Sequence, residues 1–301
     1  MPHIRLENVS FSFPIRLSEG IKPTQGGARP DERLRTDWLG RTRRFDVLRD
    51  ISLAFETGDR VGILGRNGSG KSTLLRLLHG IYLPESGTID IEGATDALFE
   101  LNIGTRPQAT GYENIIIGGL MRGYAREEID ERMEQIIEFA DIGDFLYLPM
   151  STYSAGMRAR LLFSLATSFD PEILLLDEWV SAGDSDFKEK AKMRMNEHVE
   201  KAGILVLASH SKNLLRATCT KALWLEQGKV VEFGPLEEVL QKFDGDGDNP
   251  AIPAKPAAQR RRERVEMRMR LEAEARVRLQ MEKEEQAKAA MEGVKDGDGT
   301  A

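Results

Sequence analysis

The chain has 301 residues, with 49 acidic and 42 basic side chains, a formal net charge of −7 and one cysteine. This length is sufficient for one large domain or two small ones with a full hydrophobic core. The acidic balance excludes the basic footprint of a nucleic-acid-binding chain, and a lone cysteine excludes an internal disulfide.

The first elements are two predicted strands. Residues 4–13 alternate between apolar and polar side chains, as a half-buried strand does, and residues 47–55 resume this pattern. Because the alternation starts almost at Met1, we expect no signal peptide. No apolar run approaches the about 20 residues that a membrane-spanning helix needs.

An insertion separates these two strands at residues 16–44. It is rich in Arg, Gly and Pro, and Leu34, Trp38 and Leu39 are spaced like one face of a short helix. Two interpretations stay open. The composition favours a solvated loop, and the alternative is a surface that docks on a membrane-embedded partner.

A predicted phosphate-binding loop follows the second strand. Residues 60–64 resemble a short buried strand, and the next nine residues fit G-x-x-x-x-G-K-[ST] before an apolar helix begins. Glycines let backbone N–H groups converge on phosphate oxygens, and the helix dipole favours the same anion. The lysine of such a loop reaches the β- and γ-phosphates, and the next hydroxyl ligates Mg²⁺. The predicted ATP-binding residues are Gly65, Arg66, Asn67, Gly68, Ser69, Gly70, Lys71, Ser72 and Thr73.

Helices and strands alternate in the rest of the first 243 residues. The apolar spacing predicts helices over 127–140, 155–168 and 186–201, strands over 173–176 and 204–208, and a hairpin over 221–234 with Gly228 in its turn. Strands that alternate with helices indicate a doubly wound α/β domain with a parallel sheet.

The composition changes after residue 243. Asp, Gly and Pro dominate residues 244–258, which predicts a linker. Residues 259–301 are charged, and their Glu and Arg side chains four positions apart support an exposed helix. Apolar residues recur at every second position from Val265 to Met281, which spreads them around a helix and disfavours a coiled coil. We therefore predict a tail that is helical or disordered.

Three chemistry-bearing residues stand at the ends of the two apolar strands. Asp177 closes the first strand and is placed to hold Mg²⁺, and Glu178 beside it can polarise the water that attacks the γ-phosphorus. His210 follows the next strand and can orient the same water. In isolation His210 would be a surface residue that caps a helix, but strand ends meet at one sheet edge, which favours catalysis.

A second anion site is predicted where helix 155–168 begins. A hydroxyl and small residues stand there, within the run Tyr153, Ser154, Ala155, Gly156 and Met157. Backbone N–H groups and the dipole at a helix N-terminus attract an anion. A chain with two such sites is suited to bind its own nucleotide at one and a partner's nucleotide at the other.

The order of these motifs over residues 1–240 resembles the ATP-binding-cassette (ABC) ATPases. The resemblance implies an α/β P-loop fold with an antiparallel β subdomain and an α-helical subdomain. It implies a head-to-tail homodimer that sandwiches two ATP molecules with Mg²⁺. By position, Ser154 and Gly156 would hold the γ-phosphate of the opposite subunit's ATP. Asp184 matches the loop that communicates between the two sites.

Two further positions follow from the resemblance. Phe13 matches the aromatic residue that stacks on adenine, and Phe45, beyond the insertion, is the alternative. Glu100 lies nearest to the position of the glutamine that contacts Mg²⁺ and water in the family.

The spelling of the motifs resembles one subgroup. Residues 153–157 replace the commoner Leu-Ser-Gly-Gly-Gln, and Thr-Gly-Tyr-Glu-Asn stands at 110–114. Together with the insertion, these look like the ATPase subunits that export capsular polysaccharide, O-antigen or teichoic acid. The resemblance implies a subunit held at the cytoplasmic face of the cell membrane by integral-membrane permease subunits, with no nucleic-acid partner.

Two other functions stay open. One is a soluble ABC-type ATPase that acts on nucleic acid or ribosomes, but such proteins usually carry a second cassette, a long coiled coil or a basic surface. The other is a non-catalytic ATP-gated scaffold, against which Glu178 and His210 argue. The tail is too short and too charged to form the glycan-binding β-sandwich that some O-antigen exporters append.

Overall fold

The computed structural model describes residues 1–15, 33–36, 43–99, 104–178 and 185–245. The chain divides into two units, Met1–Gly245 and Asp246–Ala301, and all described residues belong to the first. The described strands are β1 (His3–Ile15), β2 (Leu34–Thr36), β3 (Arg43–Glu56), β4 (Arg60–Leu64), β5 (Ser86–Glu92), β6 (Thr95–Ala97), β7 (Ile173–Asp177), β8 (Ile204–Ala208), β9 (Lys221–Glu226) and β10 (Lys229–Pro235). The α-helices are α1 (Lys71–Leu78), α2 (Gly111–Met121), α3 (Arg126–Ala140), α4 (Ala155–Ala166), α5 (Ser185–Lys201), α6 (Lys212–Thr218) and α7 (Leu236–Gly245), with 3₁₀ turns at Gly143–Tyr147 and Met150–Thr152.

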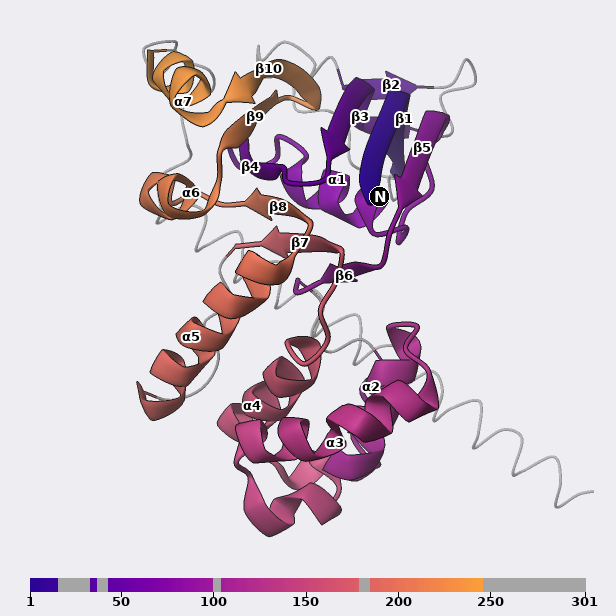
Figure 1. Cartoon of the computed structure of the whole chain (residues 1–301). Coiled ribbons are helices and arrows are strands. Elements are labelled where there is room, and N and C mark those ends of the chain that lie inside the picture. Colours follow the sequence, from indigo (N-terminus) through magenta and orange to yellow (C-terminus); the bar gives the residue numbers. More distant parts are fainter. Residues whose placement is uncertain (16–32, 37–42, 100–103, 179–184, 246–301) are drawn as a thin grey trace, which may run out of the picture. The chain divides into compact units, whose positions relative to one another are not determined.

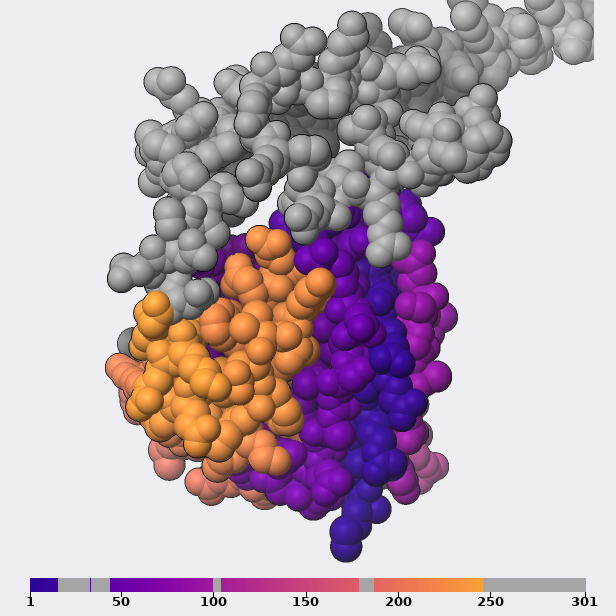
Figure 2. Space-filling view, turned by 90° about the horizontal axis from the view of Figure 1, so that it is seen from above, coloured from indigo at the N-terminus to yellow at the C-terminus, as the bar shows by residue number. Residues whose placement is uncertain are grey.

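The first layer is an antiparallel sheet with the strand order β2-β3-β1-β5. Ile4 of β1 lies opposite Phe55 of β3, and Leu6 lies opposite Leu53. Since side chains alternate between the two faces of a strand, these four residues share the buried face. Seen from above, the orange segment of β10 lies next to the violet atoms of this sheet (Figure 2), where β10 contacts β3.

The second layer is a sheet with the order β10-β9-β4-β8-β7-β6. Its strands are parallel except for β10, which returns beside β9 as a hairpin. Strand β8 is buried along its whole length, as expected of an apolar run with both faces covered. The parallel pairing of β4, β8 and β7 brings the carboxyl ends of these strands to one edge.

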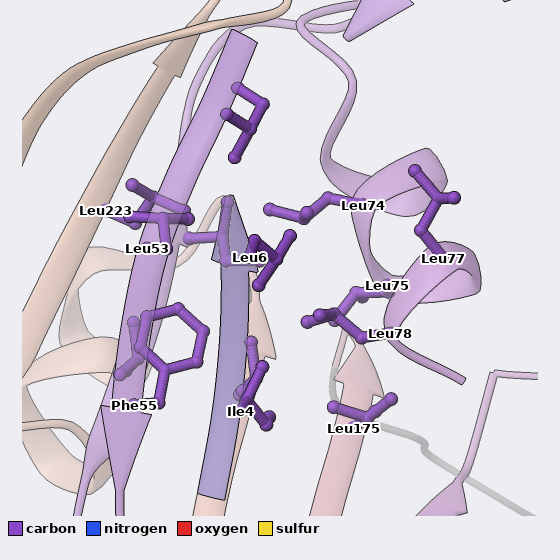
Figure 3. Packing of buried hydrophobic residues seen from close by; sticks show 14 of the residues in the cluster. Ile4, Leu6, Leu53, Phe55, Leu74, Leu75, Leu77, Leu78, Leu175 and Leu223 are labelled. Atoms are coloured by element: carbon purple, nitrogen blue, oxygen red, sulfur yellow. The ribbon is translucent and has the colours of Figure 1, made fainter. Parts of the chain in front are cut away.

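Helix α1 packs between the two sheets. Its Leu74, Leu75, Leu77 and Leu78 are buried against side chains of both, such as Leu6 of β1 and Leu175 of β7, a cluster that Figure 3 shows from close by. The helix begins directly after the phosphate loop. Its N-terminus is therefore held by the core of the molecule.

Helices α2, α3 and α4 form a separate group with its own core, away from the antiparallel sheet (Figure 1). Helix α4 belongs to two cores. Leu161 and Leu165 pack within the helical group, while Phe163 and Ala166 pack with β7, β8 and α5. One helix thus carries the residues of the second predicted anion site and ends in the core of the parallel sheet.

The insertion differs from the prediction. The spacing of Leu34 predicted a short helix, but residues 34–36 form strand β2, with Leu34 opposite Phe45 of β3. The open edge of β3 supplies hydrogen-bond partners at once, whereas a single helical turn fixes several residues for one bond. Trp38 and Leu39 lie outside the described residues.

Candidate nucleotide-binding site

The phosphate loop joins β4 to α1, and its glycines are required by their own surroundings. Gly65 has a φ of 150°, and a Cβ there would lie 2.2 Å from the carbonyl oxygen of Leu225. Gly70, with φ 110°, would place a Cβ 3.0 Å from the carbonyl oxygen of Val47. The backbone therefore adopts a tight turn that a side chain would not allow.

Lys71 lies inside this turn and is 8% exposed. Its Nζ donates to the carbonyl oxygens of Gly65 at 2.8 Å and Arg66 at 3.3 Å. Burial lowers the pKa of Lys71, while the charges of Asp177, Glu178 and Glu226 act in the opposite direction. A partly buried ammonium group at the N-terminus of a helix is suited to an anionic ligand.

Asp177, Glu178 and His210 follow strands β7 and β8 at the same sheet edge. Asp177 lies opposite Ala208 in the register, and the backbone N–H of Glu178 donates to the Ala208 carbonyl at 2.8 Å. The Glu178 carboxylate accepts from the backbone N–H of His210 at 2.9 Å. The structure thus brings these three predicted residues together with the loop after β4, since β4, β8 and β7 are neighbours.

Ser209 is a residue that the motif analysis missed. It is 2% exposed, and its hydroxyl lies 2.9 Å from Oε2 of Glu178. The sequence carried only a weak indication, because Ser209 stands immediately before His210. Its contact with Glu178 depends on the pairing of β7 with β8, which no local pattern contains.

The residues at this edge fit ATP and Mg²⁺. The Ser69 hydroxyl is buried at the loop and has no hydrogen-bond partner among the described residues, and Gly65 and Gly70 keep the turn free of side chains. Ser72 and Asp177 supply the oxygen donors that Mg²⁺ prefers. Within the described ranges no three acidic, histidine or cysteine side chains form a ready-made metal site. The phosphates of the nucleotide would therefore complete the coordination.

The two candidate adenine-stacking residues lie on neighbouring strands of the antiparallel sheet. Phe13 and Phe45 are directly opposite each other on β1 and β3. Phe13 is 38% exposed, whereas Phe45 is partly buried under the guanidinium of Arg33, 4.6 Å from the ring centre. Arg33 also donates to the Gly68 carbonyl at 3.1 Å. Phe13 thus offers the more accessible ring.

The second predicted anion site is well formed but stands apart from the sheet edge. Ser154 caps α4, and its hydroxyl accepts from the backbone N–H of Met157 at 3.1 Å. Ser154 and Ala155 are exposed. The ring of Tyr153 is buried, and its hydroxyl donates to the Phe145 carbonyl, so this side chain is used inside the helical group.

Gly156 differs from the glycines of the phosphate loop. Its backbone is outside the left-handed region, and the nearest atom to an added Cβ is the Ser154 hydroxyl oxygen at 3.8 Å. Nothing in the described part of the chain requires a glycine here.

The Thr-Gly-Tyr-Glu-Asn run has a structural role. Thr110 and Glu113 cap α2 reciprocally, and the buried Asn114 side chain bonds to the Arg106 backbone at both its N–H and its carbonyl. A Cβ on Gly111 would lie 2.2 Å from the Tyr153 hydroxyl. This run therefore holds the loop before α2 against the start of α4.

Two predicted residues lie outside the described part. They are Glu100, expected near Mg²⁺, and Asp184, expected to communicate between two sites. Their roles remain predictions. No helix in the described ranges is long and apolar enough to cross a membrane.

Sequence comparison relates the chain to export ATPases. Residues 48–181 match the profile of a family described as ABC transporter. An O-antigen export ATP-binding protein of Yersinia enterocolitica (RfbE) is 39% identical over 239 residues, which cover 77% of this chain and 98% of that protein. A teichoic acids export ATP-binding protein of Bacillus anthracis (TagH) is 45% identical over 198 residues, or 66% of this chain and 36% of that protein. The chain thus spans little more than a third of this relative.

Comparison with solved structures confirms the predicted fold class. An ATP-binding cassette solved as a dimer in a post-hydrolysis state, bound to ADP and Pi, aligns with a TM-score of 0.55 and 20% identity. The alignment covers 77% of this chain and 98% of that chain. At this identity the likeness shows the fold alone.

Proposed function

Since this chain belongs to the ABC transporter family of ATP-binding proteins, we propose that it is the ATP-hydrolysing subunit of a polysaccharide exporter. Its cargo would be a cell-surface glycan such as capsule, O-antigen or a related lipid-linked polymer, as the names of its relatives suggest. The cassette spans residues 1–243. The observation that carries the proposal is the meeting of the phosphate loop, Asp177, Glu178 and His210 at one sheet edge.

The chemistry of hydrolysis follows from this edge. Backbone N–H groups of the loop and the Lys71 ammonium bind the β- and γ-phosphates. Ser72 and Asp177 would hold Mg²⁺, which would supply positive charge against the negative charge that develops on the phosphates. Glu178 accepts a proton from the attacking water, and the imidazole of His210 orients that water and contacts the γ-phosphate.

Closure of two copies would complete each site. The exposed N-terminus of α4 in one subunit would contact the γ-phosphate bound to the other, through Ser154 and the backbone at Gly156. The absence of any internal requirement for glycine at 156 supports this role. Each γ-phosphate then bridges two subunits, so ATP holds the dimer and ADP releases it.

A permease would receive this motion at the helical group. The segment 104–113 lies between the phosphate loop and α4 in the sequence, and the Asn114 side chain is hydrogen-bonded to its backbone at Arg106. Leu120 and Met121 at the end of α2 are 50% and 61% exposed, which provides apolar surface for a partner. Contact with integral-membrane subunits would hold the protein at the cytoplasmic face of the membrane.

Substitution of Glu178 tests the proposal. In Glu178→Gln we expect ATP turnover to fall by about two to four orders of magnitude, because the amide cannot accept the proton. Affinity for ATP should stay within about twofold, and Glu131→Gln on the exposed face of α3 is the matched control. Equal turnover in Glu178→Gln and the unmodified protein would favour a non-catalytic scaffold.

Isolation of the protein with its bound partners tests the part of the proposal that concerns transport. Purified in mild detergent from its own cells, the tagged protein should retain an integral-membrane protein with several spans. A chain that instead co-purifies with ribosomes or nucleic acid, and whose turnover they stimulate, would be the soluble ATPase.

A further inference from the structure

We propose that Ser209 is a positioning residue for ATP hydrolysis, which acts by fixing the carboxylate of Glu178. The assignment rests on the proposed function. Ser209 follows β8 directly, is 2% exposed, and its Oγ lies 2.9 Å from Oε2 of Glu178.

The direction of this hydrogen bond is set by a third residue. The backbone N–H of Ser211 donates to the Ser209 hydroxyl oxygen at 3.1 Å. A hydroxyl has one hydrogen to donate, and an ionised carboxylate can only accept. The Ser209 hydrogen therefore points to Glu178, and the N–H of Ser211 keeps the hydroxyl in that orientation.

The carboxylate is held from two sides. Oε2 accepts from the Ser209 hydroxyl, and Oε1 accepts from the backbone N–H of His210 at 2.9 Å. Both donors come from the segment after β8, while Glu178 follows the neighbouring β7. The carboxylate group is therefore fixed relative to the segment that carries His210, and its remaining lone pairs have defined directions.

The backbone of Glu178 is held by the same segment as its carboxylate. Glu178 has a φ of 67°, in the left-handed region that non-glycine residues seldom adopt. Its N–H donates to the Ala208 carbonyl at 2.8 Å, so the main chain is tied to β8 as well. Backbone and side chain are thus both anchored on the segment 208–210, which preorganises the base for a water near the γ-phosphate.

Truncation of the Ser209 side chain removes one of the two hydrogen bonds that hold the Glu178 carboxylate. In Ser209→Ala the carboxylate keeps the His210 N–H but gains rotational freedom, so fewer molecules hold the base in the productive direction. We expect kcat to fall about tenfold and KM for ATP to change less than twofold, because Ser209 acts only on the base. Ser164→Ala, which removes another buried hydroxyl that donates to a carbonyl oxygen, is the matched control and should leave kcat unchanged.

A double-mutant cycle separates this role from a general structural one. Single-turnover hydrolysis is measured for the unmodified chain, Ser209→Ala, Glu178→Gln and the double variant. If Ser209 acts through the Glu178 carboxylate, Ser209→Ala should change the residual rate of Glu178→Gln by less than twofold. An equal tenfold loss in both backgrounds would overturn the assignment, because the effect would then not pass through the carboxylate.

The same measurements distinguish the two proposals. Full turnover in Ser209→Ala with a large loss in Glu178→Gln would reject the positioning role and leave the proposed function intact. Full turnover in Glu178→Gln would reject the proposed function itself.

Discussion

The phosphate loop and the N-terminus of α4 are both helix starts with glycines and hydroxyl groups, but they differ in what demands those residues. At the loop, Gly65 and Gly70 are forced by carbonyl oxygens of the same chain, and Lys71 bonds within the turn. At α4, a Cβ added to Gly156 would meet only the Ser154 hydroxyl oxygen, at 3.8 Å, and Ser154 is exposed. The turn of the phosphate loop is thus explained by contacts within one chain, whereas contacts in the described part of the chain do not explain the glycine at 156.

The largest expected effect is at the phosphate loop. Lys71→Ala should weaken ATP binding by at least about a hundredfold, because two charge-assisted contacts to the phosphates are lost. Fluorescence titration with an ATP analogue measures this loss, and Lys192→Ala on the exposed face of α5 serves as control. Unchanged affinity in Lys71→Ala would contradict the assignment of the loop.

The sharpest test of the comparison is Gly156→Ala. In a Glu178→Gln background with ATP and Mg²⁺, we expect the dimer to weaken by about a hundredfold, because the symmetrical contact is lost twice. ATP affinity of the separate subunit should not change. Light scattering after size-exclusion chromatography measures the fraction of the protein that is dimeric.

The same substitution should leave the fold intact. Alanine in place of Gly156 should preserve the stability of the chain or raise it by about 0.5–1 kcal/mol, since glycine weakens a helix. The matched variant Gly111→Ala should lower it, because its Cβ would meet the Tyr153 hydroxyl. Dimers that form equally well with Gly156→Ala would show that α4 does not meet a partner's nucleotide.

Acid pH should weaken the packing that supports the second region. His198 of α5 is 2% exposed, its Nε2 has no hydrogen-bond partner in the part of the chain that the structure describes, and burial lowers its pKa to about 4 from 6.5. The charge of Asp170 opposes this shift, and those of Arg194 and Lys201 add to it. Between pH 6.5 and 4 the unfolded chain binds a proton that the native chain does not, so stability falls as the pH drops through this window.

The effect should be about 2 kcal/mol between pH 7 and pH 5. Urea unfolding at both pH values measures it, and His198→Gln should lose this part of the pH dependence. His3→Gln, at the surface beside Asp90, should keep it. Identical pH profiles for His198→Gln and the unmodified chain would contradict the buried neutral histidine.

The smallest expected effect is at the end of the chain. A chain that stops at Gly245 should hydrolyse ATP within about twofold of the full chain, because α7 completes the packing against β9 and β10. Steady-state turnover of both proteins provides the comparison. A collapsed rate would assign a role in catalysis to residues 246–301.

Much of the sheet edge could be predicted because its information is local. The strands β4 and β8 begin and end at the predicted residues, and the loop motif fixes its own turn. The meeting of Glu178 with His210 followed from a rule about parallel strands. By contrast, β2 depends on the open edge of β3, and the Ser209–Glu178 hydrogen bond depends on strand register. No local sequence pattern predicts either the pairing of β2 with β3 or the Ser209–Glu178 hydrogen bond.

The helical group was harder to predict from the sequence, because its contacts also join residues that are far apart in the chain. The apolar period predicted α3 and α4, but α2 was not predicted, although Thr110 and Glu113 form a recognisable cap. The role of Gly111 depends on the Tyr153 hydroxyl about forty residues later in the chain. The open surroundings of Gly156 are a property of the folded chain, so the sequence alone does not contain them.

Helix α4 packs in two hydrophobic cores, and this arrangement can amplify a small rotation of the helix. Its last turns are anchored in the core of the parallel sheet, while its first turn carries Ser154 at the far end. A helix of 12 residues is about 18 Å long, so a swing of about 10° at the anchored end displaces the tip by about 3 Å. Hydrogen bonds do not survive such a displacement. Under the proposed function, a small tilt at the base would therefore be amplified into the difference between an engaged and a disengaged nucleotide.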